Sequence, residues 1–157
     1  MVLVKWVSQD MDMFLGAREY VDTAVLPLYP VSFGNDIKQS VAMTEFIQLL
    51  TIPLERQFKG RMIMLPGHSY LKNKSKEKLI EEAAVWEKEL FDNGFKHVFF
   101  VTSDSVWKSL EGELKAGLIW LPSIPLAAMD EGARNNILED QVKQLLQLFM
   151  QKWQEDV

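Results

Sequence analysis

The residues best suited to chemistry in this sequence follow its short apolar runs. They are Ser32, His68, Ser69, Tyr70, Thr102, Ser103, Asp104 and Ser123. Hydroxyl and imidazole groups can hold a small anion, and a histidine beside a hydroxyl or a carboxylate can act as a general acid or base. The set therefore supports two hypotheses, a ligand-binding site for a small anion and a catalytic site centred on His68.

These residues come together only if the apolar runs are parallel strands. Three runs end in Leu-Pro, at Pro27, Pro66 and Pro122, and a fourth, residues 97–101, is followed by Thr102. Proline cannot donate to a sheet ladder and disfavours helix in the residue before it, so each Leu-Pro indicates the end of a strand. The carboxyl ends of parallel strands share one edge of the sheet, where ligands bind in α/β proteins.

Stretches with helical periodicity separate these runs. The expected strands are 2–7, 24–31, 61–65, 97–101 and 118–121, and the expected helices are 8–22, a long helix from 36, 75–93, a short helix after Ser103 or Asp104, and a carboxyl-terminal helix. This alternation predicts a single α/β domain over residues 1–157. It is a three-layer sandwich with a mainly parallel four- or five-stranded sheet, helices on both faces, and a flavodoxin-like or Rossmann-like topology.

Prolines and capping residues refine the expected elements. Ser8 and Ser75 are expected helix N-caps, and Asn136 with Glu139 could form a capping box at the start of the last helix. Pro53 should kink or split the long helix.

The strand boundaries carry two further expectations. Pro27 and Pro30 make the run 24–31 an edge strand or a merely extended segment, because neither proline has an N–H to donate. Residues 66–74 are expected to form a loop, so that His68 lies beyond the end of its strand.

Composition excludes several classes of function. The 157 residues include no cysteine, which excludes disulfides, thiolate catalysis and sulfur-ligated zinc, and two histidines give a weak basis for any other metal site. The net charge of −5 disfavours nucleic-acid binding. No apolar run is long enough to span a membrane, so we expect a cytoplasmic protein without membrane contact.

Known α/β sites are also missing necessary groups. Pro66 and Pro122 stand where a phosphoacceptor receiver domain needs its aspartate and lysine, and Asp10 and Asp12 would repel a flavin phosphate after the first strand. The sequence has no dinucleotide or phosphate-loop glycine pattern and no nucleophile elbow. We therefore expect no cofactor.

Two surface features point to partners. Four lysines, Lys72, Lys74, Lys76 and Lys78, lie beside the His68 segment and favour an anionic ligand or partner, although nearby glutamates offset their charge. The last helix has apolar residues on more than one face: Leu145, Leu146, Leu148, Phe149, Met150 and Trp153. It is either wedged deeply against the sheet or forms a homo-oligomer or a larger assembly.

The segment 17–28, with Lys5-Trp6 and residues 64–67, resembles the YpiF-like family of uncharacterised bacilli proteins. The resemblance implies a small cytosolic bacterial protein and brings with it no activity, cofactor or catalytic residue. The leading hypothesis is a non-catalytic binding or protein-interaction module with a small-anion site at the carboxyl edge of the sheet. The alternative is a small hydrolase or group-transfer enzyme that uses His68 as its general acid or base.

Overall fold

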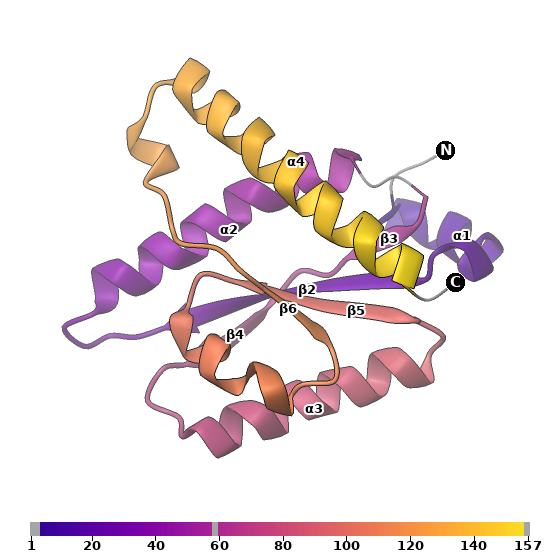
Figure 1. Ribbon diagram of the computed structural model, residues 1–157, viewed down its shortest axis with the longest axis horizontal. Coiled ribbons are helices and arrows are strands. Elements are labelled where there is room, and N and C mark those ends of the chain that lie inside the picture. The colour runs from indigo at the N-terminus through magenta and orange to yellow at the C-terminus, as the bar shows by residue number, and fades with distance from the viewer. Residues whose placement is uncertain (1–3, 58–59, 156–157) are drawn as a thin grey trace.

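One parallel sheet organises the molecule, and the computed structural model describes residues 4–57 and 60–155 of it (Figure 1). The strand order is β1-β3-β2-β5-β6, and β4 also pairs with β2. The strands are β1 (Val4–Lys5), β2 (Thr23–Val31), β3 (Met62–Met64), β4 (His68–Leu71), β5 (His97–Thr102) and β6 (Gly117–Trp120). Every strand pairing among the described residues is parallel.

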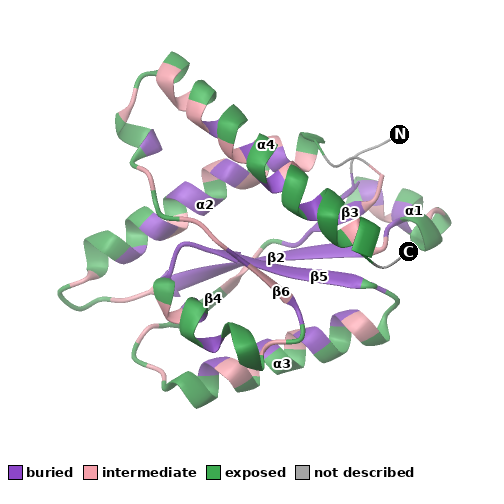
Figure 2. Ribbon diagram, viewed as in Figure 1, coloured by how far each residue is buried: buried purple, intermediate pink, exposed green. Residues whose placement is uncertain are grey.

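Helices cover both faces of the sheet, which confirms the predicted three-layer α/β architecture (Figure 1). The α-helices are α1 (Ser8–Gly16), α2 (Ile37–Gln57), α3 (Lys76–Asp92) and α4 (Glu131–Glu155), and the 3-10 helices are η1 (Arg18–Tyr20), η2 (Ser105–Glu113) and η3 (Leu126–Ala128). One core lies under α1, α3 and η2, and the other lies under α2 and α4. The buried strands run between these two layers (Figure 2).

The strand β2 lies at the centre of the sheet, which corrects the expectation of an edge strand or extended segment at 24–31. It continues through Pro27 and Pro30, with β3 and β4 on one side and β5 on the other. Leu65 N–H donates to Val25 O, so the odd-numbered residues of β2 face β3 and β4. Pro27 therefore faces the break between β3 and β4. Pro30 faces the other side, beyond the last β5 pairing at Pro27, so neither proline removes a ladder bond.

A bulge separates β3 from β4. Val25 pairs with Met64 and Leu28 pairs with His68, so three steps along β2 match four steps along its neighbour. The extra residue lies at Pro66-Gly67, where Gly67 has a φ of 123°. Residues 66–74 are therefore not simply a loop: the chain resumes a strand at His68, which is within the sheet rather than beyond it.

Several helix boundaries differ from the expected ones. Val7, not Ser8, is the N-cap of α1, and that helix ends at Gly16 rather than near residue 22. Pro53 lies within α2 without splitting it. The last helix begins at Glu131, with the Asp130 carboxylate accepting the N–H of Ala133, so the expected capping box lies inside the helix.

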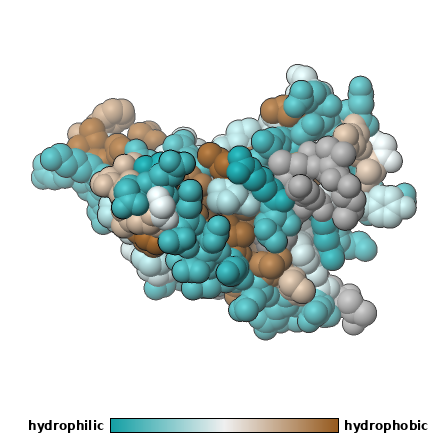
Figure 3. All heavy atoms as spheres, turned by 90° about the horizontal axis from the view of Figure 1, so that it is seen from above, coloured by the Kyte–Doolittle hydropathy of each residue, from teal (hydrophilic) through white to brown (hydrophobic). Residues whose placement is uncertain are grey.

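Most of the apolar side chains on the several faces of α4 pack against the rest of the chain. Leu145 and Phe149 are fully buried, whereas Leu148 and Met150 remain about half exposed. Trp153 donates a 2.8 Å hydrogen bond from Nε1 to the Thr23 hydroxyl. Figure 3 views the molecule from the side of α4, where hydrophobic atoms form small groups among hydrophilic ones. The deep-wedge alternative accounts for most of these residues, and self-association through α4 stays a prediction.

None of the helices in the described part of the chain combines the length and apolar character that crossing a membrane requires.

Candidate functional site

Three of the predicted site residues form a buried hydrogen-bonded cluster at the carboxyl edge of the sheet. The Tyr70 hydroxyl donates a 2.6 Å hydrogen bond to Asp104 Oδ2, and Asp104 N–H donates to Thr102 Oγ1 at 3.1 Å. The three residues are at most 4% exposed. The parallel pairing of β4 and β5 with β2 brings these residues together, although the sequence predicted a loop and not a strand around Tyr70.

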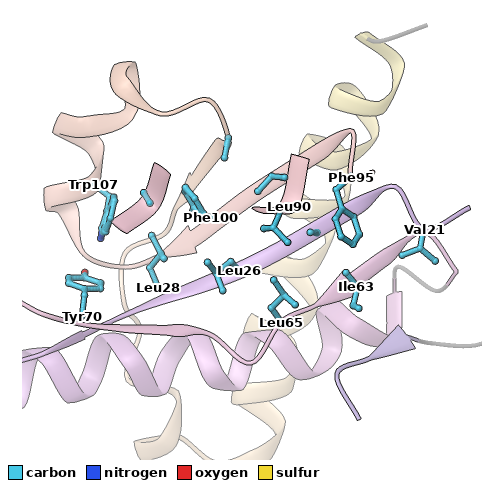
Figure 4. Close-up of a cluster of buried hydrophobic side chains, with 14 of the residues drawn as sticks. Val21, Leu26, Leu28, Ile63, Leu65, Tyr70, Leu90, Phe95, Phe100 and Trp107 are labelled. Carbon is cyan, nitrogen blue, oxygen red and sulfur yellow. The ribbon is translucent and has the colours of Figure 1, made fainter. Parts of the chain in front are cut away.

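The Asp104 carboxylate is the centre of this cluster. Its Oδ1 accepts the N–H of Val106 and so caps η2, as expected for Ser103 or Asp104. Burial and the neighbouring Asp104 charge raise the pKa of the Tyr70 phenol far above its usual value, so Tyr70 remains a hydrogen-bond donor. Trp107 packs edge-on against Tyr70 with ring centroids 5.5 Å apart, and Figure 4 shows the two side chains next to each other.

Ser103 lies next to this cluster but contributes through its backbone. Its carbonyl accepts a 3.0 Å hydrogen bond from Trp120 Nε1. Its hydroxyl is buried, and no hydrogen-bond partner for it occurs among the described residues.

The remaining predicted hydroxyls lie outside the cluster. Ser32 donates to the Asp36 carboxylate and accepts the N–H of Gly34, which orders the turn between β2 and α2. Ser69 and Ser123 are exposed. The structure therefore groups Tyr70, Thr102, Ser103 and Asp104 and separates Ser32, Ser69 and Ser123 from them.

His68 belongs to a different group, on the surface of α3. Its Nε2 lies 3.3 Å from Glu82 Oε2, and the same carboxylate binds Lys74. The Trp86 ring meets the imidazole edge-on at a centroid distance of 6.2 Å. Hydrogen bonds from Lys74 lower the pKa of the Glu82 carboxyl despite its partial burial, and His68 lowers it further.

The extra residue of the bulge decides this placement. Along β3, Ile63 and Leu65 face the α1 and α3 layer, but along β4 the residues facing it are His68 and Tyr70. Without the bulge, Ser69 and Leu71 would take those positions.

The lysines near His68 are mostly paired. Lys72 binds Asp36, Lys74 binds Glu82, and Lys78 binds Glu81. The local positive charge that the sequence suggested is therefore offset by carboxylates, also as expected.

Sequence reasoning missed the roles of two carboxylates of α3. Glu82 was expected to offset the nearby lysines, but its contact with His68 was not predicted. The other is Glu87, which is 4% exposed and whose Oε2 accepts the N–H groups of Lys115 and Ala116 at 2.5 and 2.6 Å. Leu79 and Ala83 repeat at a spacing of four, and Glu87 takes the next position of that stripe. A charged residue in a buried stripe was the available signal.

The outer edge of β4 is open among the described residues. Lys72 N–H donates to Val31 O, so His68 and Tyr70 point their backbone groups toward β2. The backbone groups of Ser69 and the N–H of Leu71 consequently point away from the sheet. The exposed side chains of Phe33 and Leu71 line one cavity at the end of this edge, and Phe33 lines another cavity with the exposed Ile37 and Val41.

No group of three or more potential metal ligands occurs among residues 4–57 and 60–155. The family described as "Protein of unknown function (DUF2487)" matches residues 12–153. The chain is also similar to the "Uncharacterized protein YpiF" of Bacillus subtilis (strain 168), with 32% identity over 150 residues, which cover 96% of this chain and 98% of the relative. No solved structure matches the chain.

Proposed function

Because the chain belongs to the DUF2487 family of proteins of unknown function, we propose its role from its geometry: a non-catalytic module that binds an extended segment of another protein along the open edge of β4. The observation that carries this proposal is the outward-facing backbone of Ser69 and Leu71 beside exposed apolar side chains. We also propose that the partner is a cytoplasmic protein, in line with the expectation from the sequence.

The backbone of β4 supplies the first half of the recognition. Ser69 offers an N–H and a C=O, and Leu71 offers an N–H, whereas the Leu71 carbonyl already accepts the N–H of Lys74. An incoming strand that pairs with these groups would extend the sheet in line with β1, which pairs with β3. Strand addition of this kind gains affinity from main-chain hydrogen bonds and is independent of the partner's side chains.

The side chains beside the edge supply specificity. A cavity of about 360 Å³ is lined by Val31, Ser32, Phe33, Gly34, Leu71 and Asn73, directly at the end of β4. Phe33 is 85% exposed and Leu71 is 48% exposed. Burial of such side chains under an apolar side chain of the partner removes apolar surface from water, which stabilises the complex.

The predicted small-anion site at the same edge stays a separate prediction. Tyr70 and Thr102 hydrogen-bond to Asp104, so an anion that reached them would meet a buried carboxylate. An extended peptide needs none of these buried groups, and for this reason we favour it over the anion.

Peptide selection tests the proposal. Binders selected from a random peptide library against the whole chain should lose affinity on Ser69→Pro, because proline removes an outward donor without disturbing the ladder to β2. Leu71→Lys should weaken them too. Val85→Lys, at a 71% exposed apolar residue of α3, is the matched control and should have no effect.

Hydrogen exchange on the same complexes identifies the mode of binding. Strand addition should slow exchange of the Ser69 and Leu71 amides in the complex. Selected peptides that bind Ser69→Pro as well as they bind the original chain, or that leave both amides unprotected, would contradict the proposal.

A second candidate function follows from His68. The Glu82 carboxylate lies within reach of its Nε2, as a general base oriented by a carboxylate requires. However, His68 does not line the cavity at the end of β4 or the larger cavity between α1 and α3. Hydrolysis of nitrophenyl esters or phosphates that disappears in His68→Asn and Glu82→Gln, but persists in Glu81→Gln, would favour the enzyme.

A further inference from the structure

A second cavity, of about 400 Å³, lies between α1 and α3, away from the cavity at the end of β4. Its floor consists of buried side chains from β3, α3 and the segment before β5. In Figure 4, Ile63 and Leu65 lie close to Leu90 and Phe95 of this floor. Volumes of this size and mostly apolar walls are typical of sites for small organic molecules.

The fold leaves this part of the sheet uncovered for local reasons. Within residues 4–57 and 60–155, β1 pairs with β3 over two residues and α1 ends at Gly16, and neither element reaches the bulge. Pro66 and Gly67 of the bulge line the cavity, and neither contributes a large side chain that could fill it. The cavity therefore opens beside the bulge between β3 and β4.

Two indoles form the side walls. Trp6 is 56% exposed, and Trp86 is half-buried between the cavity and His68. An apolar group that entered the cavity would cover both rings and Phe14. Aromatic walls of this kind supply most of the affinity of an apolar ligand.

Arg18 places a positive charge at the mouth of the cavity. Its guanidinium lies 5.6 Å from the centroid of the Phe14 ring, on the cavity wall. Its Nη2 donates to the carbonyl and side-chain oxygens of Asn93, at 3.2 and 3.5 Å. Both acceptors are neutral, and no ion pair of Arg18 occurs among the described residues. Its other N–H groups can bind a carboxylate in the forked geometry that guanidinium groups favour.

From these observations we propose that the cavity binds an amphipathic organic acid, with an apolar chain between Trp6 and Trp86 and a carboxylate at Arg18. Glu89 also lies at the mouth, where its carboxylate accepts a hydrogen bond from Asn93. An apolar ligand with a cationic head would instead turn toward Glu89 and the indoles. The charge of the head group therefore distinguishes the proposed ligand class from the other one.

Calorimetric titration with three ligands of equal chain length tests the charge. Decanoate, decanol and decyltrimethylammonium, all below their micelle concentrations, present the same tail with an anionic, neutral and cationic head. Decanoate should bind the tightest. Arg18→Met should lower the affinity for decanoate by about fivefold to tenfold, because one charged hydrogen bond is lost, and should leave the affinity for decanol unchanged. Arg56→Met, an exposed arginine in the last turn of α2 and outside the cavity, is the matched control.

The location is tested with tryptophan fluorescence. Decanoate with a terminal bromine quenches tryptophans that it contacts, so Trp86→Phe should remove part of the quenching, and Trp120→Phe, on the far side of β5, should not. The proposal is overturned if none of the three ligands binds, if decyltrimethylammonium binds the tightest, if Arg18→Met and Arg56→Met behave alike, or if quenching is the same in both tryptophan variants.

Discussion

The hydroxyl of Tyr70 donates a 2.6 Å hydrogen bond to the Asp104 carboxylate, which joins the edge strand β4 to the loop after β5. The two residues are separated by the whole of α3 in the sequence. Because the same carboxylate caps η2 through Val106, the bond also connects the edge strand to the helical layer above β5 and β6. Together with its pairing to β2, this contact connects β4, and the open edge that we propose to bind a partner, to the rest of the fold.

Removal of the Tyr70 hydroxyl tests that dependence. Tyr70→Phe leaves a buried carboxylate without one of its donors, and we expect a loss of about 2 kcal/mol in the free energy of unfolding. Urea denaturation followed by circular dichroism measures it. Tyr20→Phe, at a 67% exposed tyrosine, should cost almost nothing. Equal stability of the two variants would show that the bond does not hold β4.

The bulge is tested at Gly67. Gly67→Ala combines a φ of 123° with a Cβ that would lie 2.4 Å from Tyr29 Cε2, and we expect a loss of about 3 kcal/mol or more. Gly94→Ala has a similar φ of 94° in open space, so its smaller loss, about 1 kcal/mol, measures the backbone strain alone. Thermal and urea unfolding of both variants give the difference. Equal losses would mean that Tyr29 does not restrict the bulge.

Glu87 is expected to hold the turn before β6. Glu87→Ala leaves the buried N–H of Ala116 without its acceptor and also removes the acceptor of Lys115, so we expect a loss of about 2 kcal/mol or more. Glu81→Ala, at a largely exposed glutamate of the same helix, is the control. Amide exchange at Ala116 should quicken only in the Glu87 variant, and unchanged exchange there would contradict the role.

Stability should fall at alkaline pH because of two buried tyrosines. Burial, with a smaller contribution from the Glu55 charge, raises the pKa of Tyr29 from 10.0 to about 12, and the pKa of Tyr70 is also raised. In the unfolded chain these phenols lose their protons near pH 10. The unfolded state then binds fewer protons than the folded state, so the free energy of unfolding decreases as pH rises from 10 through 12.

Denaturant titrations at successive pH values measure this decrease. Tyr29→Phe should flatten the slope between pH 10 and 12, because phenylalanine has no proton to lose. Tyr20→Phe is the control. A slope that is the same in the original chain and in Tyr29→Phe would contradict the assignment of this pH dependence to Tyr29.

Local signals were sufficient for the elements whose boundaries are set by their own residues. The strand expected at 97–101 extends from His97 to Thr102, and the helix expected at 75–93 extends from Lys76 to Asp92 with Ser75 as its N-cap. In both cases the apolar residues that define the element lie within it, and the cap of the helix immediately precedes it. The parallel direction of β3 and β5 relative to β2 also followed, since long helical connections between short apolar runs permit little else.

The prediction that prolines mark strand ends was wrong where the neighbouring strand determines whether a missing N–H matters. Pro27 ends no strand, because its missing N–H faces the bulge between β3 and β4, and the position of that bulge is a property of a segment nearly forty residues away. The sequence showed Pro66-Gly67 as a strand end, although the chain resumes its pairing with β2 one residue later.

By itself, then, the sequence determined the α/β class and the order along the chain of the strands other than β4 and of the helices between them, because these follow from the periods of apolar residues. Only the tertiary structure decided which residues at the carboxyl edge touch and which face each occupies. The reason is the single extra residue between β3 and β4: it turns His68 and Tyr70 toward α3 and leaves Ser69 and Leu71 on the open edge, an outcome that depends on pairing with β2 and is invisible in either segment alone.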